Sequence, residues 1–557
     1  MRAERVLPIS VILITGFLAL MVMLNVILPA DVFHWDESHH ALYSARIVKS
    51  LHFRDWDWFW DTTHRQTLWP FLHSWVIAAF MWVFGVSYAS ARAANLFLFF
   101  LLAAGTFFVG RALDKDKGGW IGLLAWVFVI TSYVLWSLGA QNMIEALGGL
   151  ITLSAFYSLL RLQQSGKWLW IAPLGVLLGL ILVTKYNYAF LLYCPFAVWA
   201  LYDLVNTICS VEDAHPVKEY KKRKKKQPAK AKAGDLRPRL WRFFLKYFLI
   251  SIPVLAASGW WLLGTNREKK WAMIFYLGKE SPSIGIAQAE SLIGQWLFYF
   301  KALIFDYTWF QPLGVAVIIG LMGILFLLKK KELPVVLLTV FAWVPLLISV
   351  FVIPSKEQRF IYPFVPAIFL AAAYFYVMAW QRAKETVAPH MRRYLGAVGV
   401  MLMLLVILAQ ARAMGDFFLG RATYIYSPLR IKGEGAIDVF NYFSGNVPAH
   451  APIAFVVNFG LFNPYNVEFH FSLTRSPQYR NAVVYRFYSP PRQFYRGMYI
   501  LTVRPDRDSS YAAVYPPTEE SLDGWNKFID KNLAFLRLAG EKRFPKLGLT
   551  AQIYIVK

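Results

Sequence analysis

The chain has 557 residues and a formal net charge of +25 at pH 7, yet only 16% of its residues are charged and 57% are hydrophobic. A soluble nucleic-acid-binding protein of this charge spreads its basic residues over a mostly polar surface, so the composition excludes that class, a disordered chain and an ordinary soluble enzyme. The two cysteines, Cys194 and Cys209, are too few for a disulfide framework.

Apolar runs long enough to cross a hydrocarbon core of ~30 Å recur along most of the chain. The first run, at 6–30, is longer than the apolar core of a cleavable signal and predicts a retained helix. Ten further runs lie at 91–111, 119–138, 144–160, 168–184, 188–204, 243–264, 314–328, 333–353, 361–380 and 395–411. We therefore predict a mainly α, polytopic membrane protein with about eleven transmembrane helices.

The basic residues of the short loops predict the orientation, because moving Lys and Arg across the membrane against the potential is costly. With a cytoplasmic N-terminus, the basic short loops all fall on the cytoplasmic side: 111–117, 161–167, 329–331 and 382–393. The densest basic run, 221–226, also falls there, within a loop at 205–242 that we expect to be disordered and to anchor the topology near anionic lipid headgroups. The plasma (inner) membrane is the expected location.

The pattern of the sequence changes after residue 414. Period-two apolar stretches, which are typical of strands, alternate there with helix-like segments. The stretches lie at 453–457, 483–487, 498–503 and 553–556. One helix is expected to begin at Thr518, whose hydroxyl can cap it. We predict a membrane domain at 1–414 and a soluble, extracytoplasmic α/β domain at 415–557.

The first external loop, at 31–90, begins with the adjacent carboxylates Asp36 and Glu37. Holding charged carboxylates beside hydrocarbon is costly, because burial disfavours the charged form. A carboxylate at the mouth of a lipid-facing cavity can take a proton from an acceptor hydroxyl, or orient it for attack on an activated sugar carbon. The alternative is a helix cap without a chemical role.

Farther along this loop, three carboxylates alternate with four aromatic residues at 55–61, before His64, Arg65 and Trp69. The pattern suits either an aromatic belt at the membrane interface or a sugar-binding surface, because sugar C–H groups stack on rings while hydroxyls find acceptors. The apolar stretch at 71–84 is expected to lie along the interface, with a further span as the alternative.

Two charged residues are expected at external helix ends within the apolar half of the chain. Glu145 lies in the hairpin between the third and fourth spans, and a carboxylate at such depth is a functional candidate. A carboxylate that complements the helix dipole is the alternative. Lys185 follows another span, and snorkelling to the interface is its alternative.

Cations in a short external loop oppose the positive-inside trend and call for an anionic ligand. Lys356 and Arg359 lie in such a loop together with Glu357. A phosphate or pyrophosphate fits these cations, because guanidinium offers a planar fork of donors and lysine a compact charge. A salt-bridge cluster is the alternative. Arg267, in the second external loop at 265–310, can serve the same anion.

In this order and on one side, these segments resemble the GT-C superfamily of glycosyltransferases that use lipid-phosphate sugars. Asp36-Glu37 with 41–46 is similar to the Asp-Glu motif of protein O-mannosyltransferases and aminoarabinose lipid A transferases. The stretches 69–75, 179–186 and 356–366 resemble further segments of the superfamily. Trp69 stands where the lipid A transferases carry a lysine, so no lipid A specificity is carried over.

The resemblance implies inverting transfer of a sugar from a polyprenyl-phosphate donor to a glycolipid, polysaccharide or protein hydroxyl on the extracytoplasmic side. It makes Asp36 the general base or acceptor-orienting carboxylate, with Glu37 in support and Glu145 as the second acidic position. It makes Arg359 and Lys356 the residues that stabilise the phosphate leaving group, which lowers the need for a metal. No cofactor is expected to be required, although a divalent metal is compatible with the sequence.

Further candidates fall into two sets. The additional donor-phosphate candidates are His64, Arg65, Lys185 and Arg267. The sugar or acceptor candidates are Tyr43, Asp55, Asp57 and Trp69. The expected partners are the lipid donor, the acceptor and membrane lipids, without nucleic acid. Two other functions are weighed: a transporter or flippase of a lipid-linked saccharide, which needs charges and broken helices near the midplane, and a non-catalytic scaffold.

Overall fold

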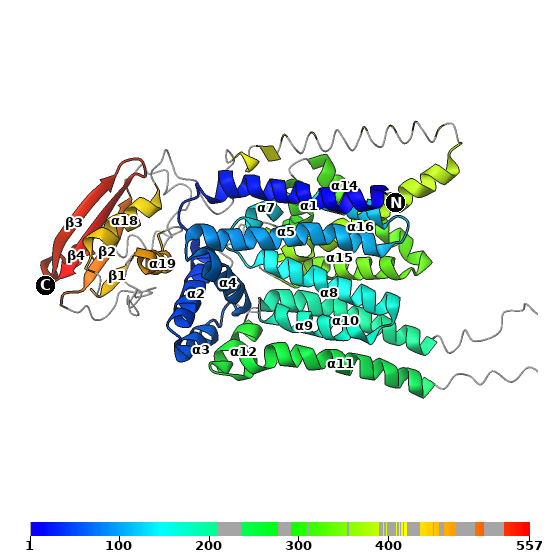
Figure 1. The fold of residues 1–557 in the computed structure, drawn as a ribbon, viewed down its shortest axis with the longest axis horizontal. Helices are drawn as coiled ribbons and strands as arrows, with labels where there is room; N and C mark the ends of the chain where they lie inside the picture. Colours follow the sequence, from blue (N-terminus) through cyan, green and yellow to red (C-terminus); the bar gives the residue numbers. More distant parts are fainter. Residues whose placement is uncertain are drawn as a thin grey trace, which may run out of the picture.

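A computed structural model describes the chain at 2–209, 236–276, 291–308, 311–353, 356–388, 435–448, 451–455, 462–474, 496–505 and 529–557, with single residues between 391 and 419. A bundle of long helices forms most of the molecule, and a small sheet lies at one end of it (Figure 1). The predictions on 221–226, 483–487 and Thr518, and most of the span at 395–411, lie outside the described residues.

Seven of the described helices are long and apolar enough to cross a membrane. They are α1 (Arg2–Val22) with its π-helical end Met23–Ile27, α5 (Tyr88–Leu113), α10 (Tyr186–Cys209), α11 (Leu236–Leu263), α14 (Gln311–Leu327), α15 (Leu333–Phe351) and α16 (Val365–Thr386). Shorter apolar helices accompany them: α4 (Leu72–Phe84), α6 (Gly118–Ile130), α9 (Ile171–Leu182) and α13 (Leu292–Phe305). The chain is therefore an integral membrane protein of mainly helical fold, and the count of eleven spans stays a prediction.

The predicted span at 119–138 is interrupted. Helix α6 ends at Ile130, and α7 (Tyr133–Gly139) begins after a break. In the break, the Thr131 hydroxyl donates to the Val127 carbonyl at 2.7 Å, and Ser132 forms a β-bridge with Thr308. Helix α7 is followed by α8 (Glu145–Ser165), so the predicted span is divided into two shorter helices.

The helices differ in direction, as Figure 1 shows. The long helices, α5, α10 and α11 among them, run along the long axis of the molecule, whereas α2 (Trp35–His52) and α4 cross it beside the sheet. The short helix α3 (Trp56–His64) joins them. A crossing direction at the end of the bundle is the arrangement expected of helices that lie along a membrane interface.

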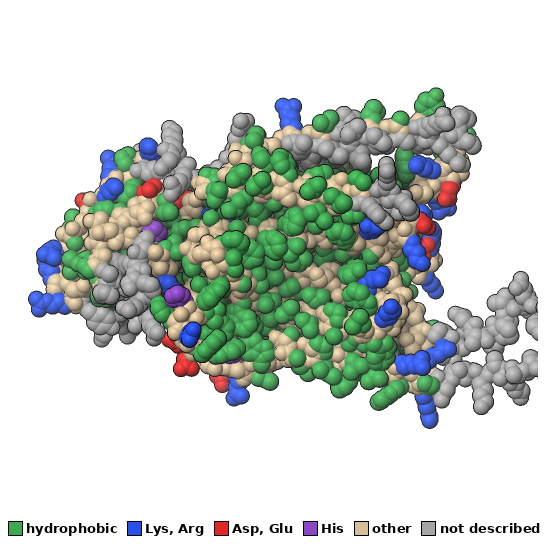
Figure 2. Space-filling model, in the orientation of Figure 1, with side chains coloured by type: hydrophobic (Ala, Val, Ile, Leu, Met, Phe, Trp, Pro, Cys, Tyr) green, Lys and Arg blue, Asp and Glu red, His purple; other side chains and the backbone are tan. Residues whose placement is uncertain are grey.

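The surface of the bundle is divided by polarity. Apolar side chains cover most of its length, and Lys and Arg gather at the end where the N-terminus lies (Figures 1 and 2). The sheet is at the opposite end. This distribution agrees with the loop-charge pattern, although the orientation itself stays a prediction.

The sheet has the strand order β1-β2-β4-β3. Strand β1 (Ile453–Phe455) pairs in parallel with β2 (Tyr499–Pro505), while β4 (Leu549–Val556) is antiparallel to both β2 and β3 (Leu536–Phe544). In β4, Leu549, Ala551 and Ile553 alternate into one buried core, as a period-two pattern predicts. A small C-terminal α/β unit is thereby confirmed, completed by α18 (Ala436–Asn446) and α19 (Pro464–Thr474).

The C-terminal unit is joined to the first external loop. The Asp31 carboxylate accepts hydrogen bonds from the backbone N–H groups of Ala436 at 2.7 Å and Ile437 at 3.1 Å, and so caps α18. Arg46 of α2 forms an ion pair with Glu468 of α19. Helix α2 is therefore held by both parts of the chain, while the domain boundary at 414/415 stays a prediction.

Candidate active site

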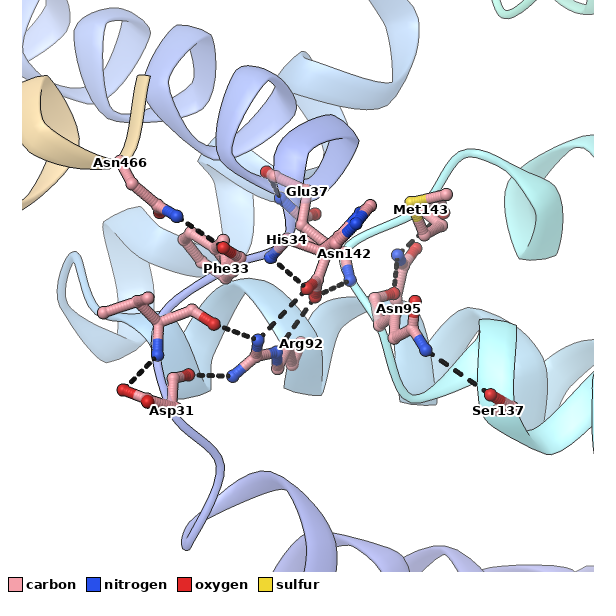
Figure 3. A network of polar contacts seen from close by, with 12 residues as sticks. Asp31, Phe33, His34, Glu37, Arg92, Asn95, Ser137, Asn142, Met143 and Asn466 are labelled. Atoms are coloured by element: carbon pink, nitrogen blue, oxygen red, sulfur yellow. Dashed lines mark hydrogen bonds and ion pairs between the residues drawn. The ribbon is translucent and has the colours of Figure 1, made fainter. Parts of the chain in front are cut away.

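Glu37 is the centre of a buried hydrogen-bond network at the start of α2 (Figure 3). Its Oε1 accepts from Arg92 Nε and from the Asn142 backbone N–H, both at 2.9 Å. Its Oε2 accepts from Arg92 Nη2 at 3.1 Å and from the His34 backbone N–H at 2.9 Å, which closes a capping box. Arg92 also donates to the Asp31 carbonyl at 2.8 Å. Glu37 thus ties α2, α5 and the α7–α8 hairpin together.

Asp36 is adjacent to Glu37 but points to a different neighbour, because successive residues of a helix are rotated by about 100°. Its Oδ2 forms an ion pair with Nη1 of Arg359, a residue 323 positions later in the chain. Arg359 Nε also pairs with Glu357. The side chains of Asp36 and Arg359 are 16% and 21% exposed, so the pair is largely buried but reachable. The predicted base and the predicted phosphate-binding arginine therefore lie together.

The charge state of this pair follows from its surroundings. Burial would raise the pKa of Asp36, but the Arg359 guanidinium outweighs it and holds that pKa below its ordinary value. The Asp36 and Glu357 carboxylates outweigh burial in turn and raise the pKa of Arg359. Both groups are consequently charged at neutral pH.

A second acidic group adjoins the pair. Glu145 Oε1 lies 3.0 Å from the Tyr188 hydroxyl and 3.4 Å from Lys185 Nζ. The same hydroxyl lies 3.2 Å from the Arg359 carbonyl, which connects Glu145 to the loop that carries Arg359. Glu145 Oε2 is buried and has no hydrogen-bond partner among the described residues. Burial lowers the pKa of Lys185, against the opposing effect of Glu145.

Rings pack around the next turn of α2. His40 follows Asp36 by four residues, so both lie on the same face of the helix. Its ring centroid is 5.2 Å from that of Trp69 and 4.8 Å from that of His73, and His39 lies 4.8 Å from both Tyr43 and Trp69. Of the predicted sugar or acceptor residues, Tyr43 and Trp69 therefore lie against the two histidines in the turn of α2 that follows Asp36.

His39 and His40 were missed as candidates, although the four-residue spacing from Asp36 to His40 was the available signal. Burial lowers the pKa of His40 well below its ordinary value, and the positive charges of Lys185 and Arg359 act in the same direction. His40 is therefore a neutral imidazole, able to donate one hydrogen bond and accept another.

Lys356, which is predicted to bind the donor phosphate, is engaged by backbone carbonyls in this structure, and its role in phosphate binding stays a prediction. Its ammonium group donates to three backbone carbonyls at the end of α15: Ser349 at 2.6 Å, Val350 at 2.8 Å and Ile353. An ammonium group has three N–H donors, so no donor remains for a phosphate. Lys356 caps α15, whose last carbonyls lack partners within the helix.

The remaining cationic candidates form a second group, at the contact between α3 and α12 (Arg267–Tyr276). His64 Nδ1 lies 3.0 Å from Lys270 Nζ, and Arg65 pairs with an aspartate one turn earlier in α3. Arg267 is exposed at the start of α12. Within the described ranges none of these residues contacts Arg359. The predicted phosphate-binding residues therefore lie in two places. Lys185 is near Arg359, whereas His64, Arg65 and Arg267 lie at the contact between α3 and α12.

Two aspartates of the first loop are also explained by helix structure. Asp55 is the N-cap of α3, and its Oδ1 accepts from the Trp58 backbone N–H at 3.0 Å. Asp57 is exposed in the first turn of the same helix, where a carboxylate complements the dipole. Asp55 is thus a helix cap, and the contact of Asp55 and Asp57 with a sugar stays a prediction.

No group of three or more His, Cys, Asp or Glu side chains in the described part of the chain could hold a metal ion. His39, His40 and His73 pack ring against ring. Among the described residues, Arg359 and Lys185 are cations whose charges act on Asp36.

Residues 69–212 match a family model described as dolichyl-phosphate-mannose-protein mannosyltransferase. The matched segment contains Trp69, Glu145 and Lys185, whereas Asp36 precedes it and Arg359 follows it. No curated protein sequence matches the chain.

Solved structures resemble the chain over its length. ArnT from Cupriavidus metallidurans in the apo state is similar with a TM-score of 0.58 and 13% identity, over 98% of this chain and 97% of that chain. The same protein bound to undecaprenyl phosphate gives 0.56 and 14%, over 99% and 98%. The oligosaccharyltransferase AglB from Archaeoglobus fulgidus gives 0.47 and 11%, over 81% and 62%. The chain has the GT-C fold, and the resemblance predicted from the motifs is confirmed.

Proposed function

We propose that this chain is an inverting glycosyltransferase that moves a sugar from a polyprenyl-phosphate donor to a hydroxyl group on the extracytoplasmic side. The observation that carries the proposal is the contact between Asp36 and Arg359, which joins a carboxylate able to accept a proton with a cation able to bind phosphate. The ArnT structure of the same fold contains undecaprenyl phosphate, and the matching family model is named for a dolichyl-phosphate sugar. Both support a lipid-phosphate donor.

The transfer is a single displacement at the anomeric carbon. The acceptor oxygen forms the new bond to this carbon while Asp36 takes the hydroxyl proton. The bond between the carbon and the phosphate oxygen breaks on the opposite face, and its electrons stay on the lipid phosphate. Arg359 and Lys185 stabilise the negative charge that this phosphate gains.

Arg359 couples donor binding to the basicity of Asp36. Without a donor, the guanidinium holds the pKa of Asp36 low, which makes the carboxylate a weak base. A donor phosphate competes with Asp36 for this guanidinium. As Arg359 turns to the phosphate, the pKa of Asp36 rises toward the range in which it accepts a proton. The base is thereby activated when the sugar is in place.

Glu145 provides an acceptor for a sugar hydroxyl. Its Oε1 is engaged by Tyr188 and Lys185, whereas Oε2 has no partner among the described residues although it is buried. A buried acceptor left without a hydrogen bond costs about 1–3 kcal/mol, so an incoming hydroxyl would recover that energy. The neutral His40 ring, on the same face of α2 as Asp36, is placed to orient the acceptor.

The test measures sugar release from a panel of radiolabelled polyprenyl-phosphate monosaccharides by purified protein in native lipid. Asp36→Asn is expected to lower turnover by about 10²- to 10⁴-fold, the usual contribution of a general base. Asp116→Asn is the matched control, because this exposed aspartate follows the far end of α5. Full activity of folded Asp36→Asn would refute the assignment, and no turnover of any donor by wild type would exclude the monophosphate donors tested.

A further inference from the structure

A basic pocket lies between α10 and α11, away from the candidate active site. The cavity has a volume of about 350 Å³ and is lined by Trp168, Thr207, Arg239, Arg242, Phe243 and Lys246. We propose that this pocket binds the phosphate of an anionic phospholipid headgroup in the cytoplasmic leaflet. The proposal concerns a lipid that the protein holds, and it is independent of the sugar and of the acceptor.

The pocket and the active site lie at opposite ends of α10. Tyr188, near the start of this helix, contacts Glu145, whereas Thr207 lies near its end. Nineteen residues separate Tyr188 from Thr207, which corresponds to about 28 Å at 1.5 Å per residue. This length is close to the thickness of a hydrocarbon core. The pocket therefore belongs to the end of the bundle where Lys and Arg gather, far from the sheet (Figures 1 and 2).

Helix α11 presents its cations to the cavity as a stripe. Arg239, Arg242 and Lys246 are spaced by three and four residues, so they lie on one face of the helix, together with Phe243. Arg242 forms no ion pair with any residue in the described ranges. A cation in this position can donate a fork of hydrogen bonds to a phosphate.

The wall of the pocket is fixed by contacts between the two helices. Asp203 of α10 pairs with Lys246 and accepts a hydrogen bond from the Tyr247 hydroxyl at 3.0 Å. These contacts hold α11 against α10 at the level of the cavity. The positive charge of Lys246 is thereby compensated, so Arg242, which forms no ion pair in the described ranges, is the lining cation that provides net attraction for an anion.

The surroundings favour a phosphate that belongs to a lipid. On α11, Trp241 is 67% exposed and Phe244 58% exposed, and Trp168 at the pocket is 47% exposed. Aromatic residues of this kind mark the level of the membrane interface. Trp168 and Phe243, which line the pocket itself, offer an apolar surface to the acyl chains of a ligand that enters sideways from the bilayer. Basic pockets between transmembrane helices on the cytoplasmic side bind such headgroups.

The test compares retention of phosphatidylglycerol and phosphatidylcholine by the purified full chain, using native mass spectrometry. Wild type is expected to retain phosphatidylglycerol preferentially. The double variant Arg239→Gln/Arg242→Gln should bind it about tenfold or more weakly, because each cation near the surface contributes about 1 kcal/mol. The matched control Lys329→Gln/Lys331→Gln removes the same charge at exposed positions beyond α14 and should behave as wild type.

Three results would overturn the proposal. The first is equal retention by wild type and the arginine double variant, and the second is an equal loss in the lysine control, which would indicate surface charge alone. The third is displacement of the lipid by millimolar inorganic phosphate, which would indicate a site for free phosphate. The variant Arg239→Lys/Arg242→Lys guards against misfolding, because it keeps both charges and should retain most of the binding. Lipid retention is measured without turnover, so failure here leaves the proposed transferase activity untouched.

Discussion

Replacing Glu37 should lower the stability of the fold, whereas replacing the adjacent Asp36 should lower the transfer activity. Glu37→Ala leaves the guanidinium of Arg92, a residue only 2% exposed, without its carboxylate. Breaking a buried ion pair by removing one partner costs about 3–5 kcal/mol. The backbone N–H groups of Asn142 and His34 lose their acceptor as well. Since folded proteins are stable by only about 5–15 kcal/mol, Glu37→Ala should leave little folded protein.

The assay is thermal unfolding in detergent, followed by tryptophan fluorescence and by size-exclusion elution. Asp36→Asn is the matched control, because it changes the neighbouring residue of the same helix and its side chain is 16% exposed. Asp36→Asn should lower stability at neutral pH by only about 1 kcal/mol, because Arg359 keeps Glu357 as a partner, while its transfer activity is lost. The double variant Glu37→Gln/Arg92→Met should be more stable than Glu37→Ala, because no uncompensated charge is left.

The reverse pattern would refute this reasoning. A Glu37→Ala protein that is as stable as wild type but inactive would give Glu37 a chemical role. An Asp36→Asn protein that unfolds would make the contact between Asp36 and Arg359 a structural one.

Three further predictions concern single residues. Lys356→Gln should lower stability by about 1–3 kcal/mol through loss of the α15 cap, without a change in the KM for the donor; a raised KM would restore the phosphate role. Folding lowers the pKa of Asp36, so the ionised carboxylate stabilises the folded state from neutral pH down to the ordinary pKa of 3.8, and this effect is lost as the pH falls further. The melting temperatures of wild type and Asp36→Asn should therefore converge only in acid. His40→Phe keeps an aromatic side chain but removes both ring nitrogens, and should lower kcat/KM about tenfold; unchanged kinetics would exclude the orienting role.

The membrane helices could be predicted because the bilayer demands about 20 apolar residues in a row, a property that single segments reveal. The interruption of the span at 119–138 could not. At the interruption, Ser132 forms a bridge with Thr308, a residue far along the chain. Composition reports length and polarity, whereas a break of this kind depends on a distant neighbour.

The types of residue in the predicted external loops were enough to predict part of the site. A carboxylate and an arginine on the external side implied proton and phosphate chemistry, and the fold brings Asp36 and Arg359 together. Lys356 is also a cation and lies three positions before Arg359, yet its ammonium group donates hydrogen bonds to backbone carbonyls at the end of α15. Charge in a loop therefore did not distinguish a cation that pairs with Asp36 from one that caps a helix, because the difference lies in tertiary contacts.

The position of Asp36 is determined by parts of the chain that lie far apart in sequence. One side of α2 is fixed to the bundle by the bonds of Glu37 with Arg92 and Asn142. The other side is fixed to the C-terminal unit, where Arg46 pairs with Glu468. A base must be held within a fraction of an ångström of the proton it takes, and a helix fixed on both sides meets that requirement better than a free loop. In the proposed mechanism, Glu37 holds α2 in place through Arg92, while Asp36 keeps a partner, Arg359, that a donor phosphate would displace.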